Sequence, residues 1–323
     1  MNPSVLRSKL LNNGSTRLRG YIALILGVLA LSLSPILVKG GDAPTVVTSF
    51  YRMLIAAAFW TVFLGIKTVK TSPHAPIQEA ASAVPFLVFP ILAGFSSSMD
   101  HGLWALAMNY TSVSNTSVLN GMAPVWISAA ALIFLHEKFN RKFWIGLFLA
   151  ITGMVLMSGQ GADFFIKGFN KGDLIAITSS MFYGGYFFFT QLGRRHFSTL
   201  FQMWASIVCC AFGLFILCRI LGYPLGGYST EAWRNFILVA LICQIGGYFF
   251  ITYALGCLPA SIVSPSNELN TVISSLIAIP VFGEMLSWGQ IFGCLAILAG
   301  VYLINNGKAD SSAAAENPQK GSK

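Results

Sequence analysis

Four ionisable side chains lie inside apolar stretches that are long enough to cross a membrane: Arg52, Asp100, His101 and Glu268. A charged side chain at the centre of a bilayer costs roughly 2.5–3.5 kcal/mol on insertion scales, so such residues are candidates for function. Arg52 and Asp100 are expected at similar depths in neighbouring helices, so we predict that they form an ion pair. The pair either belongs to a transport site or is a fixed structural contact. His101 is either a site residue or a buried, hydrogen-bonded histidine.

Glu268 differs from the other three because no intramembrane cation is expected near it. A buried carboxyl group without a charged partner can take up and release protons. Glu268 is therefore the best candidate for proton coupling or for binding a substrate amine. The alternative is a protonated carboxyl group that is hydrogen-bonded within the protein.

Two short polar patterns repeat every three residues in otherwise apolar segments. The first contains Ser114, Ser117 and Asn120, and the second contains Ser261, Ser264 and Asn267. Residues at this spacing share one face of a helix. These faces line two halves of a pathway, or they allow close helix packing, since Ser and Asn also form hydrogen bonds between membrane helices.

Aromatic residues are dense near Gly184-Gly185 and Gly246-Gly247. Aromatic side chains at the membrane surface form interfacial belts, but several tyrosines here are expected deeper, where they would suit an apolar or aromatic solute. Ordinary packing is the alternative. The residues that we predict for a substrate or coupling-ion pathway are Glu268, Asn267, Asn120, Ser117, Ser264, Tyr183, Tyr186, Tyr248, Trp104 and His101.

The whole sequence has the composition of a membrane protein. It has 323 residues, of which 55% are hydrophobic and only 10% are charged, compared with roughly 25% charged residues in soluble domains. Since a spanning helix needs about 20 apolar residues, we predict an all-α integral membrane protein with ten transmembrane helices. The ten ranges are Tyr21–Val38, Thr45–Ile66, Pro85–Met108, Ser112–Leu135, Phe143–Ser158, Leu174–Leu192, Thr199–Leu221, Trp233–Leu255, Ala260–Phe282 and Trp288–Ile304.

The positive charges predict the orientation of these helices. If the N-terminus is cytoplasmic, fourteen of the 20 Lys and Arg residues fall in cytoplasmic segments, five fall outside, and Arg52 lies within a span. This bias is what the positive-inside rule expects. We therefore place the protein in the cytoplasmic (inner) membrane, with both the tail of residues 1–19 and the tail of residues 307–323 in the cytoplasm.

An internal repeat is visible when the sequence is shifted by 147 positions. The shift superposes Asn120 on Asn267 and Glu137 on Glu284, whereas the equivalent of Glu268 is Gly121. The two repeats, residues 20–159 and 160–306, contain five predicted helices each, and an odd number makes the second repeat enter the membrane from the opposite side. Inverted repeats are typical of secondary transporters, in which two equivalent halves supply inward-open and outward-open states.

Five segments, spread over essentially all of residues 20–306, carry a common resemblance: Phe50–Ala56, Asp100–Ser112, Ala123–Val125, His136–Lys138 and Gly283–Gln290. Together they resemble the EamA-like branch of the drug/metabolite transporter superfamily. One departure is Thr271, which stands where Pro124 stands in the first repeat and where such proteins often carry proline. The resemblance implies a ten-helix exporter or exchanger of small metabolites, often amino acids or related compounds.

The function that we predict is secondary active transport of a small organic metabolite, with export favoured. A Walker A motif is absent from the sequence, so ATP is not expected to drive transport directly. The alternative is an integral-membrane enzyme acting on a lipid or small apolar substrate, but the sequence has no His-Glu-x-x-His motif or similar catalytic pattern. We expect no catalytic residues, cofactor, metal or nucleic-acid partner. The expected partners are a small-molecule solute and the lipid bilayer, and a homodimer is left open.

Overall fold

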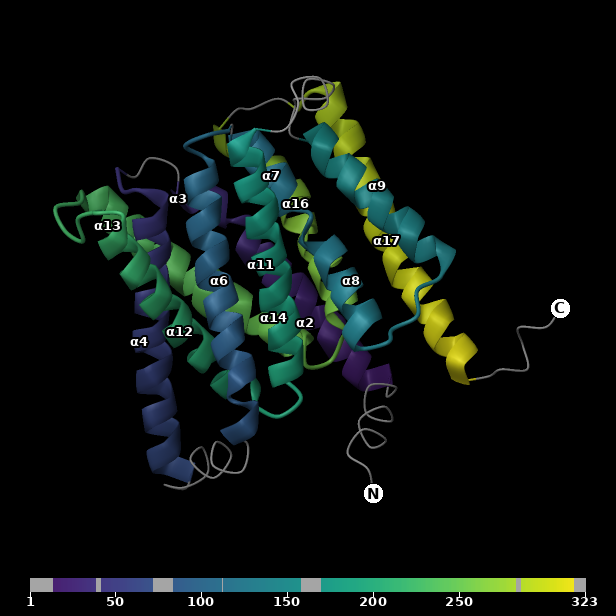
Figure 1. Ribbon diagram of the computed structural model, residues 1–323, viewed down its shortest axis with the longest axis horizontal. Helices are drawn as coiled ribbons and strands as arrows, with labels where there is room; N and C mark the ends of the chain where they lie inside the picture. The colour runs from purple at the N-terminus through teal and green to yellow at the C-terminus, as the bar shows by residue number, and fades with distance from the viewer. Residues whose placement is uncertain are drawn as a thin grey trace.

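The structure is a computed structural model that describes residues 14–38, 42–71, 84–111, 113–157, 170–282 and 286–316. Within these ranges the chain is helical and contains no strand. In Figure 1 the helices form a bundle in which α9 and α17 lie side by side at one edge and α4 lies at the opposite edge. The predicted all-α architecture is confirmed for the described residues.

Each half of the chain contributes a set of helices. The first set is α2 (Gly14–Ser32), α3 (Ser34–Val38), α4 (Thr45–Thr71), the 3₁₀ turn η1 (Val84–Phe86), α6 (Val88–Ala107), α7 (Val113–Asn120), α8 (Ala123–Phe134) and α9 (Arg141–Met157). The second set is α11 (Lys171–Gly193), α12 (Thr199–Ile220), α13 (Thr230–Val239), the π-helix η2 (Ala240–Gly247), α14 (Tyr248–Ala254), α15 (Ala260–Asn267), α16 (Leu269–Phe282) and α17 (Trp288–Glu316).

Six helical stretches of the described residues are long and apolar enough to cross a membrane. They are Gly14–Leu37, Thr45–Ile66, Asn115–Phe134, Thr199–Ile220, Thr230–Ala254 and Trp288–Gly307. The chain is therefore a multi-pass membrane protein. The other four predicted spans coincide with α6, α9, α11 and the pair α15 and α16, but these helices are not among the six.

Both terminal helices extend beyond their predicted ends. Helix α2 begins at Gly14 instead of Tyr21, and α17 continues to Glu316, within the predicted cytoplasmic tail. The last part of α17 contains Ala313, Ala314 and Ala315, and alanine has the highest helix propensity of any residue. Met1 and Lys323, whose cytoplasmic location was predicted, lie outside the described residues.

Helices α9 and α17 are packed in antiparallel directions through glycine. A Cβ atom on Gly146 would lie 2.6 Å from the carbonyl oxygen of Gly300, and one on Gly153 would lie 2.7 Å from that of Gly293. Gly146 and Gly293 are equivalent positions of the repeat, as are Gly153 and Gly300. The two contacts are therefore reciprocal, which is the pattern of a two-fold axis between the helices.

Helices α7 and α15 each contain eight residues and end at equivalent positions. Helix α7 runs from 113 to 120 and α15 from 260 to 267, a difference of 147 at both ends. In the first repeat Pro124 lies at the start of α8, and in the second Pro265 lies inside α15. Proline lacks a backbone N–H and disrupts a continuing helix. The helix is therefore interrupted at the equivalent place in each repeat, although the second repeat has Thr271 where the first has Pro124.

Candidate functional site

Asp100 is the centre of a buried hydrogen-bond group where α6, α7 and α11 meet. Its Oδ1 accepts hydrogen bonds from the Asn120 side-chain amide at 2.7 Å and from the Ser179 hydroxyl at 2.8 Å. Asn120 also donates to the Ser179 oxygen at 2.9 Å. Since Asn120 is the last residue of α7, the interruption of this helix directs its amide towards α6 and α11. Sequence reasoning missed Ser179, which lies one helical turn before Tyr183 in an aromatic segment.

Arg52, the cation near this group, contacts His101 instead of Asp100. Arg52 Nη2 is hydrogen-bonded to His101 Nε2, while His101 Nδ1 lies 2.7 Å from the Ser97 carbonyl oxygen and 3.7 Å from Asp100 Oδ2. Within the described residues, no salt bridge joins Arg52 to Asp100, so the predicted direct ion pair is not formed in this structure. The prediction used only the similar depth of Arg52 and Asp100 in the membrane. In the structure the Asp100 carboxylate is oriented towards Asn120 instead.

Tyr183 joins α15 to the same face of α11. Its hydroxyl oxygen accepts a hydrogen bond from the Asn267 side-chain amide at 2.9 Å. Its side chain also interacts with Tyr248 on α14, and the rings of Tyr186 and Tyr248 pack edge to face with centroids 5.8 Å apart. Ser179, Tyr183 and Tyr186 are separated by four and three residues, so they share one face of α11.

Glu268 lies at the interruption between α15 and α16 and is only 6% exposed. Its Oε1 has no hydrogen-bond partner among the described residues. The carboxyl group lies near Tyr183 on the tyrosine face of α11. The backbone is irregular just after Pro265, since neither helix includes Glu268. A buried carboxyl group with an unpaired oxygen can bind a proton or a donor group on a solute.

The equivalent serines of the two repeats have different surroundings. Ser117 on α7 is exposed, whereas Ser264 on α15 is completely buried and its hydroxyl has no hydrogen-bond partner among the described residues. All eight residues of α15 are buried. Trp104 is half-buried on α6, and no hydrogen bond in the described part of the chain joins it to Asp100 or Tyr183. The two predicted polar faces are therefore not equally accessible.

The N-terminal end of α15 is held against the first repeat and α11. The Ser261 hydroxyl donates to Glu137 Oε2 at 2.9 Å, and the Ala260 backbone N–H donates to Gln191 Oε1 at 2.9 Å. The first N–H groups of a helix have no partner inside the helix, so Gln191 satisfies one of them. These two hydrogen bonds hold the N-terminal end of α15, which is opposite to Asn267, against its neighbours.

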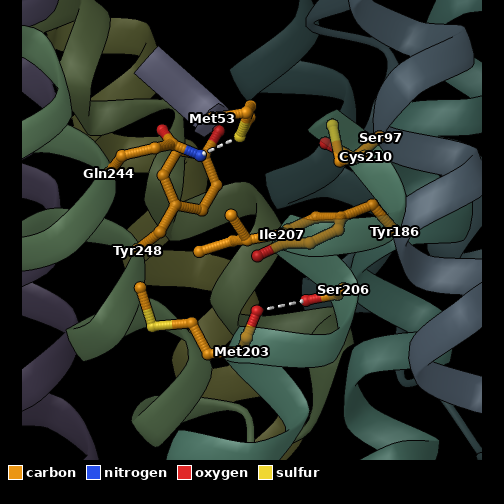
Figure 2. A pocket seen from close by; sticks show the side chains of 9 residues that line it. All are labelled: Met53, Ser97, Tyr186, Met203, Ser206, Ile207, Cys210, Gln244 and Tyr248. Atoms are coloured by element: carbon orange, nitrogen blue, oxygen red, sulfur yellow. Dashed lines mark hydrogen bonds between the residues drawn. The ribbon is translucent and has the colours of Figure 1, made fainter. Parts of the chain in front are cut away.

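Two of the predicted tyrosines line a small pocket shown in Figure 2. Tyr186, Tyr248, Ser97 and Gln244 surround it together with apolar side chains, and it has room for about one water molecule. The Gln244 side-chain amide donates to the Met53 sulfur at 2.8 Å. The space is too small for an organic solute in this conformation.

A family model described as the EamA-like transporter family matches residues 18–159 and again residues 170–306. The chain belongs to the EamA-like transporter family. This confirms the resemblance seen in the sequence. Because the same model matches each half of the chain, the EamA-like unit is present twice.

Relatives of this EamA-like chain have transporter names. It is 25% identical to "Uncharacterized transporter YyaM" of Bacillus subtilis, over 77% of this chain and 80% of that protein. It is also 25% identical to human "Solute carrier family 35 member G1", over 66% of this chain and 60% of that protein. A solved crystal structure of a protein superposes with a TM-score of 0.68 at 17% identity, over 90% of this chain and 96% of the other, which shows a shared fold.

Proposed function

We propose that this EamA-like protein is a secondary active transporter that moves a small organic metabolite across the cytoplasmic membrane by alternating access. The proposed architecture has ten spans in two inverted five-helix repeats, with both termini in the cytoplasm. The membership of the family and the transporter names of the relatives support transport of a solute. The proposed direction is export, and the proposed substrate class is an amino acid or a related compound.

The observation that carries the proposal is the difference between α7 and α15. These helices have equivalent sequence positions and equal lengths, yet α15 is completely buried while α7 exposes Ser117. A transporter with two equivalent half-pathways is expected to open one and close the other in each state. On the predicted orientation, the buried helix α15 lies in the cytoplasmic half, so this difference supports the proposal of an outward-facing state.

The polar groups around α11 suit a solute with both an amine and a carboxylate. Arg52 supplies the cation, and its Nε has no hydrogen-bond partner among the described residues. Asp100 and Glu268 supply carboxyl groups, and Glu268 retains an unpaired oxygen. Because Asp100 already accepts two hydrogen bonds, we assign the exchangeable proton or the amine of the solute to Glu268.

Reconstitution tests the proposal directly. Purified protein in liposomes is given a panel of radiolabelled amino acids, with and without a pH gradient, and uptake into the lumen is measured. We expect at least one amino acid to accumulate under the gradient and to stop accumulating when a protonophore collapses it. Liposomes without protein are the control. If no member of the panel moves in either direction, including by exchange against internal amino acid, the proposed substrate class is wrong.

A further inference from the structure

An apolar groove opens on the surface between α8 and α11, away from the polar groups described above. Its volume is about 760 Å³, and its walls include Ile133, Phe134, Gly184 and Phe188. Ile133 and Phe134 are 61% and 69% exposed, so the groove is open at the surface. In a multi-pass membrane protein, an exposed wall of this composition faces the lipid hydrocarbon. Trp126 lies at its inner side and donates its indole N–H to the Ser180 hydroxyl at 2.8 Å.

The groove has the length of one membrane leaflet. It follows α11 from Met181 to Leu192, close to the end of the helix, which is roughly 16 Å at 1.5 Å per residue. One leaflet contributes about half of a hydrocarbon core that is roughly 30 Å thick. The inner end of the groove is therefore close to the middle of the membrane, and the other end is at the level of the lipid headgroups.

A single cationic side chain, Arg195, lines the groove at its headgroup end. Arg195 is exposed, and the described part of the chain supplies no partner for its guanidinium group. The neighbouring Arg194 is used differently, because it donates to the backbone carbonyl oxygens of Thr252 and Phe197. Arg195 is therefore available to an external anion, and its planar guanidinium group is suited to a phosphate.

We propose that the groove between α8 and α11 is a binding site for an anionic phospholipid, with its phosphate on Arg195 and one acyl chain against Phe188 and Phe134. The apolar walls disfavour a charged, water-soluble solute. Lipids of the surrounding leaflet are always present, and their acyl chains match these walls. Helix α8 belongs to the first repeat and α11 to the second, so the lipid bridges the two repeats. Basic sites of this kind on the cytoplasmic side bind anionic headgroups.

Native mass spectrometry of the full-length protein in detergent tests this site without measuring transport. Phosphatidylglycerol and phosphatidylcholine with the same acyl chains are added separately, and the fraction of lipid-bound protein is measured. We expect phosphatidylglycerol to bind more tightly than phosphatidylcholine. Arg195→Ala should weaken phosphatidylglycerol binding about five-fold. Arg141→Ala is the matched control, since Arg141 is exposed on α9 and does not line the groove.

A second pair of variants tests the apolar part of the site. Ala130→Phe should fill the groove and weaken binding of both lipids, because Ala130 lines it on α8. Leu132→Phe is the control, since Leu132 is exposed on the same helix but outside the groove. Equal binding of the two lipids, unchanged by Arg195→Ala, overturns the proposal. A dimer that is lost in Ala130→Phe and that excludes lipid also overturns it, because a second copy of the chain would then occupy the groove.

Discussion

Asn120 and Asn267, which occupy equivalent positions of the two repeats, donate their side-chain amides to the same face of α11. Asn120 donates to Ser179 at 2.9 Å, and Asn267 donates to Tyr183 at 2.9 Å, one helical turn further along. Each asparagine is the last residue of an eight-residue helix. The C-terminal residues of α7 and α15, one from each repeat, therefore contact the same face of α11. Motion of one repeat against the other must change at least one of these two bonds.

Labelling of the equivalent serines is expected to be asymmetric. In Ser117→Cys the thiol should react with a membrane-impermeant maleimide added from outside, because Ser117 is exposed. In Ser264→Cys the thiol should remain unlabelled, because Ser264 is completely buried. The measurement is the modified fraction after a fixed time, with denatured protein as the control for full reactivity. Equal labelling of both positions from outside contradicts an outward-facing state.

The orientation of the two repeats is tested at the loops that precede α9 and α17. Lys138 and Ser287 are both exposed. In whole cells, a cysteine at position 287 should react with an impermeant reagent, whereas a cysteine at position 138 should react only after the membrane is permeabilised. Labelling of both positions from the same side would reject the inverted arrangement.

Glycine at the contact between α9 and α17 should be essential for stability. In Gly153→Ala the new Cβ atom would lie 2.7 Å from the Gly293 carbonyl oxygen and 2.8 Å from the Ile297 backbone nitrogen. Backbone atoms cannot move aside easily, so we expect a loss of roughly 1–3 kcal/mol and a lower Tm in detergent. Gly289→Ala is the control, because its nearest neighbouring atoms are 3.9 Å away. Equal Tm values for the two variants would show that the contact is loose.

The hydrogen bonds of Asp100 predict that removing Arg52 as well will not restore the folding of an Asp100 variant. Asp100→Leu removes the carboxylate that accepts from both Asn120 and Ser179. The Asn120 amide keeps the Ser179 oxygen and the Ser179 hydroxyl keeps the backbone carbonyl of residue 100 as acceptors, so we expect a loss of about 1–3 kcal/mol in total. Adding Arg52→Ala should not recover the yield of folded protein, because Arg52 contacts His101. Asp42→Leu is the control, since Asp42 accepts a serine hydroxyl at the same 2.8 Å but is exposed. Recovery in the Arg52→Ala and Asp100→Leu double variant would restore the ion-pair interpretation.

The positions of the helices follow largely from the sequence, because apolar length and polar boundaries are local properties. The predicted segment Phe143–Ser158 corresponds to α9 at Arg141–Met157. The predicted segment Ser112–Leu135 contains two helices instead of one, because it is interrupted after Asn120. The amide at this interruption is bonded to Asp100 and Ser179, which lie 20 and 59 residues away in the sequence. Contacts between residues so far apart in the sequence cannot be predicted from the pattern of a single segment.

The partners within the site depend on the rotation of each helix about its axis, which depth in the membrane does not determine. Arg52 was therefore assigned to Asp100, although it contacts the adjacent His101. The faces of Ser117 and Ser264 were expected to be alike, because their sequences are equivalent. Their burial differs, since a single conformation of a two-fold arrangement need not be symmetric.

Glu268 should determine the pH dependence of transport. Three features support this: the carboxyl group is buried, its Oε1 has no partner among the described residues, and it lies beside Asn267 at the helix interruption. Glu268→Gln preserves size and hydrogen-bonding groups but cannot titrate. We expect the variant to fold with an unchanged Tm, and either to transport at a rate that no longer varies with pH or to exchange solute without net accumulation.

The matched control for Glu268→Gln is Glu231→Gln, because Glu231 is an exposed carboxylate in the first turn of α13. Uptake into liposomes is measured for both variants across a range of pH. The control should keep the wild-type profile, since an exposed carboxylate can exchange its proton with water in either state of the transporter. In the proposed mechanism, a proton bound to Glu268 leaves only with a change of conformation, and this would couple its release to movement of the solute. A wild-type pH profile in Glu268→Gln would assign this residue to packing and would require another group to carry the proton.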